Sequence, residues 1–269
     1  MGKTIFVSGG SRGIGKGIVT AFAASGYDVA FTYYSQQSEA EILKESLAEK
    51  YKVRIFIRQA ALQEDGVAES VMEWSADVLG HLDIVVCNAG MTIHTNFLEM
   101  KKEEADYSFS LNFLSYLICA KEAARHMKER KIKGRIIMIT STRGLCTYPE
   151  DPLYGGMKAA LHRACESLAL EFSGDGITVN CIAPGNTAVR GNYTREELTA
   201  LRFQRKIPAG RAGTPNEVAE LVKLLASDDG EYITGSIFKI DGGLILPVMP
   251  LDFSEDAGPG WHELPQHIR

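Results

Sequence analysis

Short apolar segments alternate with longer segments of helical periodicity along most of this 269-residue chain. The short segments are rich in β-branched residues, as strands are. Strands that alternate with helices form parallel βαβ units with right-handed crossovers, and near-continuous apolar strands indicate that helices cover both faces of the sheet. The sequence therefore predicts a single-domain α/β fold, a doubly wound parallel sheet of the Rossmann type with about seven strands.

The same pattern sets the bounds of each element. The expected strands cover residues 5–7, 28–33, 53–58, 82–87, 135–140, 177–182 and 236–240. The expected helices cover residues 14–25, 37–50, 63–80, 103–130, 153–173 and 215–227. The last helix has the clearest start, because Thr214 suits an N-cap and Pro215 suits the first helical position.

Two regions interrupt the alternation, while no linker, repeat or low-complexity stretch divides residues 1–245. We therefore expect residues 1–269 to form one domain. Residues 186–213 make a long connection with a short helix expected at 194–205, which is typical of a substrate-binding loop or lid. Residues 246–269 form a tail with proline, glycine and acidic residues. Its apolar side chains suit folding over a pocket, its own or a neighbouring subunit's, and subunit packing or partial disorder is the alternative.

Composition and charge exclude several classes of protein. A net charge of −5 and a pI of about 5.8 argue against a surface that binds nucleic acid. No apolar run reaches the roughly 18 to 20 residues of a membrane span, and the first residues form a strand rather than a signal peptide. The five cysteines contain no CxxC pair, and the six histidines show no metal-ligand spacing. We expect a cytoplasmic protein with buried, reduced thiols, no membrane partner and no metal site.

The first expected strand runs into a glycine-rich turn, Ser8–Gly15, that opens a helix. Glycines let a pyrophosphate approach the backbone, and the start of a helix supplies N–H groups and partial positive charge. The spacing is GxxxGxG, and a turn that binds nothing is the alternative. We expect a dinucleotide cofactor at this turn. The residues expected to contact it here are Gly9, Ser11, Arg12, Gly13, Ile14 and Gly15.

Charge also indicates the type of cofactor. Proteins that bind NAD usually carry an acidic residue after the second strand, where it holds the ribose 2′-hydroxyl. This chain has Tyr34 and Ser35 there and no carboxylate. Arg12 in the glycine-rich turn suits a 2′-phosphate, and a solvated surface arginine is the alternative. We therefore expect NADP(H) rather than NAD(H).

Polar residues follow the fourth and fifth expected strands, at the edge where open α/β sheets bind ligands. Asn88, Ala89 and Gly90 close the fourth strand, where small residues suit a cofactor ribose and a plain turn is the alternative. Ser141 ends the fifth strand, where its hydroxyl can bond to a substrate oxygen or simply cap the next turn. Asn112 lies inside an expected helix, where asparagine is disfavoured. We interpret it as holding a water or distorting the helix, with a tolerated polar position as the alternative.

Tyr154 and Lys158 are one helical turn apart, so their side chains lie on one face of an expected helix. A cation beside a phenol favours the phenolate, and we expect Lys158 to lower the pKa of Tyr154 from its usual value of about 10. A tyrosine tuned in this way can donate a proton to a carbonyl oxygen or accept one from an alcohol. The pair alone is a weak signal in a chain with ten tyrosines.

Together these motifs resemble those of the short-chain dehydrogenase/reductase family. They occur in the order typical of that family across residues 3–243, which is nearly the whole chain. The matching segments are Ser8–Gly15, Asn88–Ala89–Gly90, Asn112, Ser141, Tyr154 with Lys158, Val179–Gly185 and Asp241–Gly242–Gly243.

The resemblance implies a catalytic tetrad of Asn112, Ser141, Tyr154 and Lys158. Tyr154 would be the general acid and base, and Ser141 would orient the substrate oxygen. Lys158 would tune Tyr154 and bind the nicotinamide ribose, while Asn112 would hold a water on the proton relay. Members of the family are usually tetramers, so we expect a homotetramer. The resemblance also places cofactor contacts at Pro184, Gly185 and Thr187.

Three positions depart from the family pattern. The family often has an aspartate after the third strand, but this chain has Ala60–Ala61–Leu62, so an adenine contact at Leu62 must come from the backbone. Val189 stands where the family tends to place a threonine for the carboxamide, and Thr187 lies two residues earlier. Ser8 replaces the leading threonine of the glycine motif and keeps its hydroxyl.

The resemblance implies an NADP(H)-dependent oxidoreductase that interconverts a secondary alcohol and a ketone by hydride transfer. A sugar or polyol, a hydroxysteroid and a 3-oxoacyl thioester all remain possible substrates. A catalytically silent nucleotide-sensing or scaffold protein is the alternative, although such a protein would tend to lack part of the tetrad. Cations in the substrate loop suit an anionic substrate, but we interpret them as a solvated helix face. These cations are Arg190, Arg195, Arg202, Arg205 and Lys206.

Overall fold

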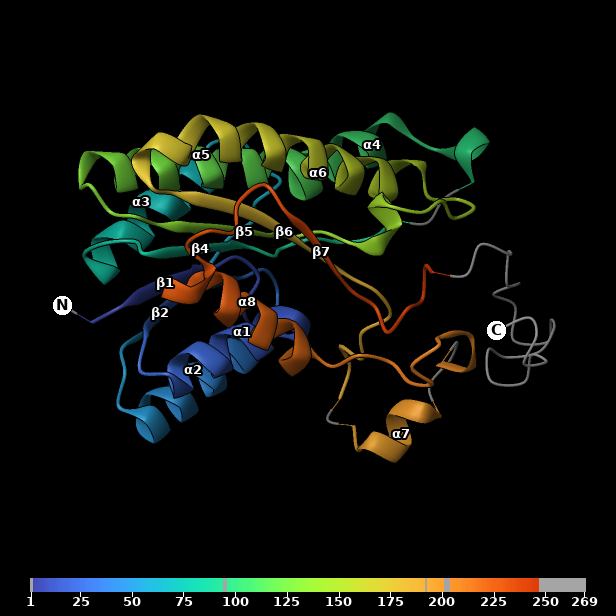
Figure 1. Ribbon diagram of the computed structural model, residues 1–269, viewed down its shortest axis with the longest axis horizontal. Coiled ribbons are helices and arrows are strands. Elements are labelled where there is room, and N and C mark those ends of the chain that lie inside the picture. The colour runs from blue at the N-terminus through green and yellow to red at the C-terminus, as the bar shows by residue number, and fades with distance from the viewer. Residues whose placement is uncertain (1, 94–95, 192, 201–203, 247–269) are drawn as a thin grey trace.

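The computed structural model describes residues 2–93, 96–191, 193–200 and 204–246. Within these residues, seven parallel strands form one sheet in the order β3-β2-β1-β4-β5-β6-β7 (Figure 1). This confirms the predicted Rossmann-type sheet. The strands are β1 (Thr4–Val7), β2 (Asp28–Tyr33), β3 (Ile55–Gln59), β4 (Ile84–Cys87), β5 (Arg135–Ile139), β6 (Thr178–Pro184) and β7 (Ile237–Ile240).

The strand order reverses beside β1, which pairs with β2 on one side and with β4 on the other. Ile5 is in register with Val29 on β2 and with Ile84 on β4, so three apolar side chains lie side by side across this part of the sheet. Ligands of doubly wound folds bind outside the carboxyl ends of the strands at such a reversal. The topology therefore places the candidate site where β1 and β4 end.

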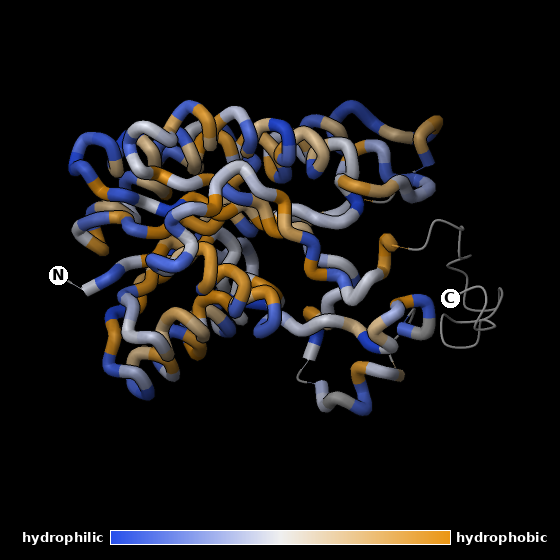
Figure 2. Tube along the Cα trace, in the orientation of Figure 1, coloured by the Kyte–Doolittle hydropathy of each residue, from blue (hydrophilic) through white to orange (hydrophobic). Residues whose placement is uncertain are grey.

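Helices cover both faces of the sheet, as Figure 1 shows. Each face packs against its own cluster of buried apolar side chains, and hydrophobic segments run through the middle of the molecule between the two helical layers (Figure 2). The strands are consequently buried on both sides, as their continuous apolar sequences predicted. One layer holds α3 (Val67–Leu79), α5 (Ser115–Glu129) and α6 (Pro152–Phe172). The other holds α1 (Gly13–Ala24), α2 (Gln37–Tyr51) and α8 (Pro215–Ala226).

The helix expected at 103–130 is not continuous. A five-residue π-helical turn, Ser110–Leu114, separates α4 (Lys102–Phe109) from α5. Asn112 lies in this turn with no exposed surface, and its side chain bonds to the backbone of Met91 instead of solvent. Wide turns of this kind often occur at functional sites. Of the two interpretations offered for Asn112, the distortion of the helix is confirmed.

The substrate loop contains a shorter helix than expected. α7 (Arg195–Thr199) begins with a capping box between Thr194 and Glu197, and a 3₁₀ turn follows at Gln204–Lys206. The predictions for Arg202 and for nearly all of the tail, from 247 onward, fall outside the described residues. Within the part of the chain that the structure describes, no helix is both long and apolar enough to cross a membrane.

Candidate active site

The glycine-rich turn is held open by β2. Thr32 Oγ1 accepts a hydrogen bond from the Gly9 N–H at 3.0 Å, and the Thr32 carbonyl accepts one from Gly10 at 2.8 Å. Gly9 and Gly13 have φ values of +68° and +53°, a region that side chains with a Cβ rarely adopt. A Cβ on Gly15 would lie 2.1 Å from the Gly9 carbonyl oxygen. The sequence therefore needs glycine at these positions to form a turn with an open backbone.

The ends of β1 and β4 are bonded to each other. Ser8 Oγ accepts hydrogen bonds from the backbone N–H of Asn88 at 2.8 Å and of Ala89 at 3.0 Å. Asn88 Nδ2 donates in return to the Ser8 and Gly9 carbonyls, each at 3.0 Å. The Ser8 hydroxyl therefore joins the ends of the two strands. Asn88 fixes the glycine-rich turn against the end of β4.

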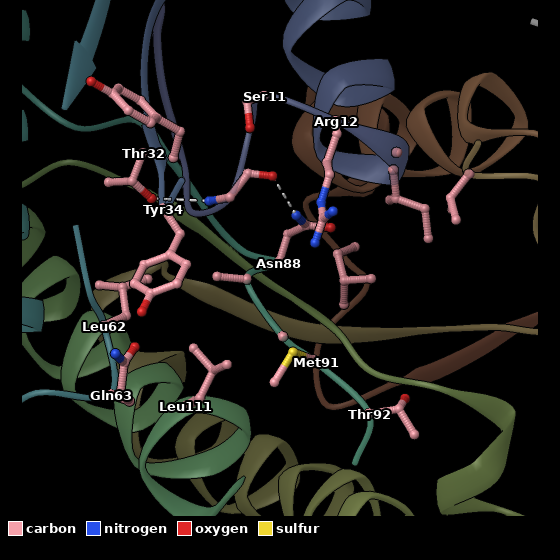
Figure 3. A pocket seen from close by; sticks show the side chains of 18 of the residues that line it. Ser11, Arg12, Thr32, Tyr34, Leu62, Gln63, Asn88, Met91, Thr92 and Leu111 are labelled. Carbon is pink, nitrogen blue, oxygen red and sulfur yellow. Dashed lines mark hydrogen bonds between the residues drawn. The ribbon is translucent and has the colours of Figure 1, made fainter. Parts of the chain in front are cut away.

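A groove of about 450 Å³ runs along these strand ends (Figure 3). Its described lining includes three cations, Arg12, Lys158 and Arg190, and no Asp or Glu. In a chain of net charge −5, this segregation of positive charge suits an anionic ligand. The predicted residues that line the groove are Gly9, Ser11, Arg12, Gly13, Ile14, Tyr34, Ser35, Leu62, Asn88, Ala89, Gly90, Tyr154 and Lys158. The predicted residues outside its lining are Gly15, Asn112, Ser141, Pro184, Gly185 and Thr187.

Lys158 is a buried lysine in the lining of the groove. Only 2% of its surface is exposed. Its Nζ donates to the Tyr116 hydroxyl and to the Ile139 carbonyl, both at 3.1 Å. Burial lowers the pKa of Lys158 to about 7, because the charged form loses hydration.

Tyr154 lies next to two cations. Lys158 Nζ is 5.5 Å from the centre of its ring, and the Arg143 guanidinium is 5.3 Å away. Burial nevertheless raises the pKa of Tyr154, while a hydrogen bond with Ser141 and the charge of Arg143 lower it. The expectation that Lys158 lowers this pKa is wrong for the protein without a ligand. The reason is that burial of the phenol raises its pKa more than the nearby charges lower it. In addition, Lys158 donates two of its N–H groups to Tyr116 and Ile139.

Arg143 is fixed by Asp151, the N-cap of α6. The Asp151 carboxylate accepts from Arg143 Nε at 2.6 Å and from the Gly155 N–H at 3.2 Å. The Arg143 guanidinium also lies 5.4 Å from the centre of the Tyr148 ring, so it is held between two aromatic rings. These contacts tie the start of α6, and therefore Tyr154, to the turn that follows β5.

Ser141 and Asn112 take up structural bonds close to Tyr154 and Lys158. Ser141 Oγ accepts from the Arg143 N–H at 3.1 Å, so the serine caps the next turn as well as contacting Tyr154. Asn112 Oδ1 accepts from the Met91 N–H at 3.1 Å, and its Nδ2 donates to the Met91 carbonyl at 2.9 Å. The asparagine therefore positions the backbone directly after β4.

Comparison with known proteins identifies the family. The model described as "Enoyl-(Acyl carrier protein) reductase" matches residues 9–245. Glucose 1-dehydrogenase 2 of Bacillus subtilis is 31% identical over 91% of this chain and 95% of its own length. A 3-oxoacyl-[acyl-carrier-protein] reductase of Synechocystis is 33% identical over 91% and 97%. The crystal structure of an acetoin dehydrogenase from Salmonella typhimurium superposes with a TM-score of 0.87 at 31% identity, covering 93% of this chain and 99% of that one.

The chain belongs to the short-chain dehydrogenase/reductase family. It is accordingly an oxidoreductase of CH–OH and C=O groups. The resemblance found in the sequence motifs is confirmed.

In this short-chain dehydrogenase/reductase, the segment after β6 lies at one side of the groove, and only part of it belongs to the groove lining. Gly185 donates to the Ile240 carbonyl at 3.0 Å, and Thr187 forms an isolated bridge with Gly213. Neither residue is part of the groove lining. Val189 and Arg190 do line the groove. Arg190 precedes α7, so its interpretation as part of a helix face is wrong.

Lys206 also departs from its interpretation as a solvated cation, because only 3% of its surface is exposed. The prediction of buried thiols holds: all five cysteines are free, and Cys146 alone among them is partly exposed. Among the residues that the structure describes, no three His, Cys, Asp or Glu side chains gather in a group that could hold a metal ion.

Several residues of the site were not found from sequence. Tyr116, Arg143 and Asp151 surround Lys158 and Tyr154, and Thr92 contributes a hydrogen bond that lowers the pKa of Tyr154. Tyr116 carries a weak signal, because it lies four residues after Asn112. Arg143 and Asp151 carry none, since a charged residue beside a turn is normally solvated.

Proposed function

We propose that this protein is an NADP(H)-dependent oxidoreductase that interconverts a secondary alcohol and a ketone. One observation carries the proposal: Tyr154 and Lys158 line the same groove as the glycine-rich turn. A proton-transferring phenol thus lies beside a surface suited to a dinucleotide. This combination supports hydride transfer coupled to proton transfer.

The groove fits a phosphorylated dinucleotide. Its glycine turn has backbone space that a Cβ would fill, and its described lining has three cations and no carboxylate. Arg12 would hold a 2′-phosphate, with Tyr34 and Ser35 next to it at the end of β2. The backbone after β3, at Leu62, would contact the adenine. Lys158 would bind the nicotinamide ribose, and Pro184, Gly185 and Thr187 would support the carboxamide end.

The residues around Tyr154 define the proton transfer. The nicotinamide, when bound, supplies or accepts the hydride. Tyr154 donates its phenol proton to the carbonyl oxygen during reduction and takes the alcohol proton during oxidation. Ser141 bonds to the same substrate oxygen and so orients it toward the phenol. Asn112 holds the Met91 backbone, which keeps the wall of the site in place.

The names of the relatives cover different carbonyl compounds: glucose, acetoin and a 3-oxoacyl chain on a carrier protein. We infer a small-molecule alcohol or ketone substrate, with a sugar or polyol, a hydroxysteroid and a 3-oxoacyl thioester as the candidate classes. The loop at 186–213 would provide the specificity. We further propose a cytoplasmic homotetramer.

A kinetic panel tests this function. Ketones, sugars, hydroxysteroids and a 3-oxoacyl thioester are assayed with NADPH and NADH in parallel. We expect turnover of at least one class, with higher kcat/KM for NADPH. Binding of NADPH without turnover of any class would contradict the proposal and favour the nucleotide-sensing or scaffold alternative.

A further inference from the structure

The Tyr116 side chain lies beneath the groove in the first part of α5, directly after the π-helical turn. Only 1% of its surface is exposed. Its hydroxyl donates to the Ile139 carbonyl at 3.1 Å, which leaves the phenol oxygen free to accept a bond from Lys158 Nζ at 3.1 Å. Burial holds the pKa of Tyr116 well above its usual value, so this phenol is neutral and is an acceptor for the ammonium.

The hydrogen bonds of Lys158 account for two of its three N–H groups. A lysine ammonium has three donors and no acceptor. One donor goes to Tyr116 and one to the Ile139 carbonyl. Tyr116 lies outside the lining of the groove, whereas Lys158 and Ile139 both belong to it. The third N–H is therefore the one left for a ligand in the groove.

The surroundings of Lys158 provide little other stabilisation for its charge. Cys181 on β6 and Cys87 on β4 are the groups that raise its pKa, yet a bond to a neighbouring thiol and burial raise the pKa of each, so both are neutral near pH 7. His162 and Tyr154 face it from α6, and the pKa of His162 is lowered by burial and by Lys158 itself. The phenol of Tyr116 is therefore its main side-chain partner, and its ring adds a cation–π contact at 4.4 Å.

We propose that Tyr116 is a positioning residue for Lys158: its phenol oxygen favours the charged form of the ammonium and directs the remaining N–H into the groove. There, the proposed nicotinamide ribose would accept that N–H. This second step rests on the proposed function, while the contact between Tyr116 and Lys158 does not. Gly90 packs against this pair and Asn112, because a Cβ there would lie 2.8 Å from Asn112 Oδ1, 3.7 Å from Lys158 Nζ and 3.8 Å from the Tyr116 hydroxyl.

The direct test is Tyr116→Phe, which removes the acceptor and keeps the ring. The protonation of Lys158 is followed by ¹⁵N NMR of its ammonium group across a pH series, in the full chain without cofactor. We expect the Lys158 midpoint to move to lower pH. Tyr27→Phe is the matched control, since Tyr27 packs on Phe22 on the opposite face of the sheet. A folded Tyr116→Phe protein with an unchanged midpoint would overturn the proposal.

NADPH affinity supplies a second readout. A charged Lys158 binds ribose hydroxyls better than a neutral one, so affinity should fall as pH rises through its pKa. Tyr116→Phe should bind NADPH about tenfold more weakly at pH 7, the effect of one bond to a charged group. The variant and the wild type should agree at a pH below both midpoints. A loss of equal size at every pH would indicate only a damaged structure and would contradict the proposal.

Two further measurements separate the possible failures. In a Lys158→Met background, Tyr116→Phe should cause no additional loss of NADPH affinity; an additive loss would contradict a role through Lys158. If Tyr116→Phe does not fold, the wild-type NMR spectrum decides: a nuclear Overhauser effect between the Lys158 ε-methylene protons and the Tyr116 ring protons supports the contact, and its absence contradicts it. Failure of the wild type to bind NADPH would reject the proposed cofactor and leave the NMR result on Tyr116 intact.

Discussion

The Arg143 guanidinium lies 5.3 Å from the centre of the Tyr154 ring. It is the cation that lowers the pKa of Tyr154, whereas Lys158 is bonded to Tyr116 and Ile139. Asp151 fixes Arg143 in this position and partly opposes it, because the carboxylate raises the same pKa. The proton affinity of Tyr154 is consequently set by the turn after β5 as well as by its own helix.

The first prediction concerns Arg143→Gln. Removal of the cation should raise the pKa of Tyr154 further, because the phenolate loses a favourable charge. Alcohol oxidation requires deprotonated Tyr154, so the pH at which kcat/KM reaches half of its maximum should move to higher pH. The measurement is the pH profile of alcohol oxidation. Arg163 is an exposed arginine on α6, the helix that carries Tyr154. Arg163→Gln is therefore the control and should leave the profile unchanged. Superimposable profiles for wild type and Arg143→Gln would show that Arg143 does not tune Tyr154.

Arg12→Gln tests the type of cofactor. If Arg12 binds the 2′-phosphate, the substitution should weaken NADPH binding about tenfold, the effect of one charge-assisted contact, and should leave NADH binding nearly unchanged. Fluorescence titration of both cofactors gives the two dissociation constants. Lys16→Gln removes a nearby charge that does not line the groove and should affect neither. Equal losses for NADPH and NADH would place Arg12 away from the 2′ position.

Two glycines offer opposite predictions. Gly15→Ala would bring a Cβ to 2.1 Å from the Gly9 carbonyl, so the turn must open and both NADPH affinity and stability should fall. Gly156 in α6 has no atom within 4 Å of an added Cβ. Gly156→Ala should therefore stabilise the protein by about 0.5–1 kcal/mol, because alanine loses less entropy in a helix. Urea unfolding and NADPH titration measure both effects. A Gly15→Ala protein as stable and as tight-binding as the wild type would refute the turn geometry.

Asp151→Ala tests the support of α6. The change removes the N-cap and leaves the half-buried Arg143 without its carboxylate, at a cost of about 2–4 kcal/mol in the free energy of unfolding. Asp106→Ala removes an exposed carboxylate that pairs with Lys102 and serves as the control, with no measurable change expected. Urea unfolding of both variants is the measurement. Equal stability of the two would mean that Asp151 does not anchor the helix.

The sheet could be predicted from sequence because its strands are local apolar signals. β2 was predicted at its observed bounds, 28–33, and the ends of the other strands differ by a few residues at most. The start of α8 followed from Thr214 and Pro215, and in the structure Thr214 forms a capping box with Glu217. These features depend on residues close together in the chain, so a pattern of neighbours was sufficient.

The π-helical turn was not predictable because its cause is distant in sequence. Asn112 bonds to Met91, which lies 21 residues earlier, and the helical periodicity of 103–130 gives no sign of that contact. The pKa of Tyr154 was predicted in the wrong direction for a similar reason. Spacing placed Lys158 beside the phenol but could not show that Tyr116 and Ile139 take its hydrogen bonds or that burial dominates.

The central claim is that Tyr154 transfers the proton in a groove that binds NADP(H). The most direct measurement compares Tyr154→Phe with the wild type, for both NADPH affinity and kcat on the best substrate of the panel. Loss of the acid and base should reduce kcat by about 100-fold or more, while NADPH affinity should stay within about twofold because the ring remains in place. A kcat close to that of the wild type would contradict the assignment of Tyr154.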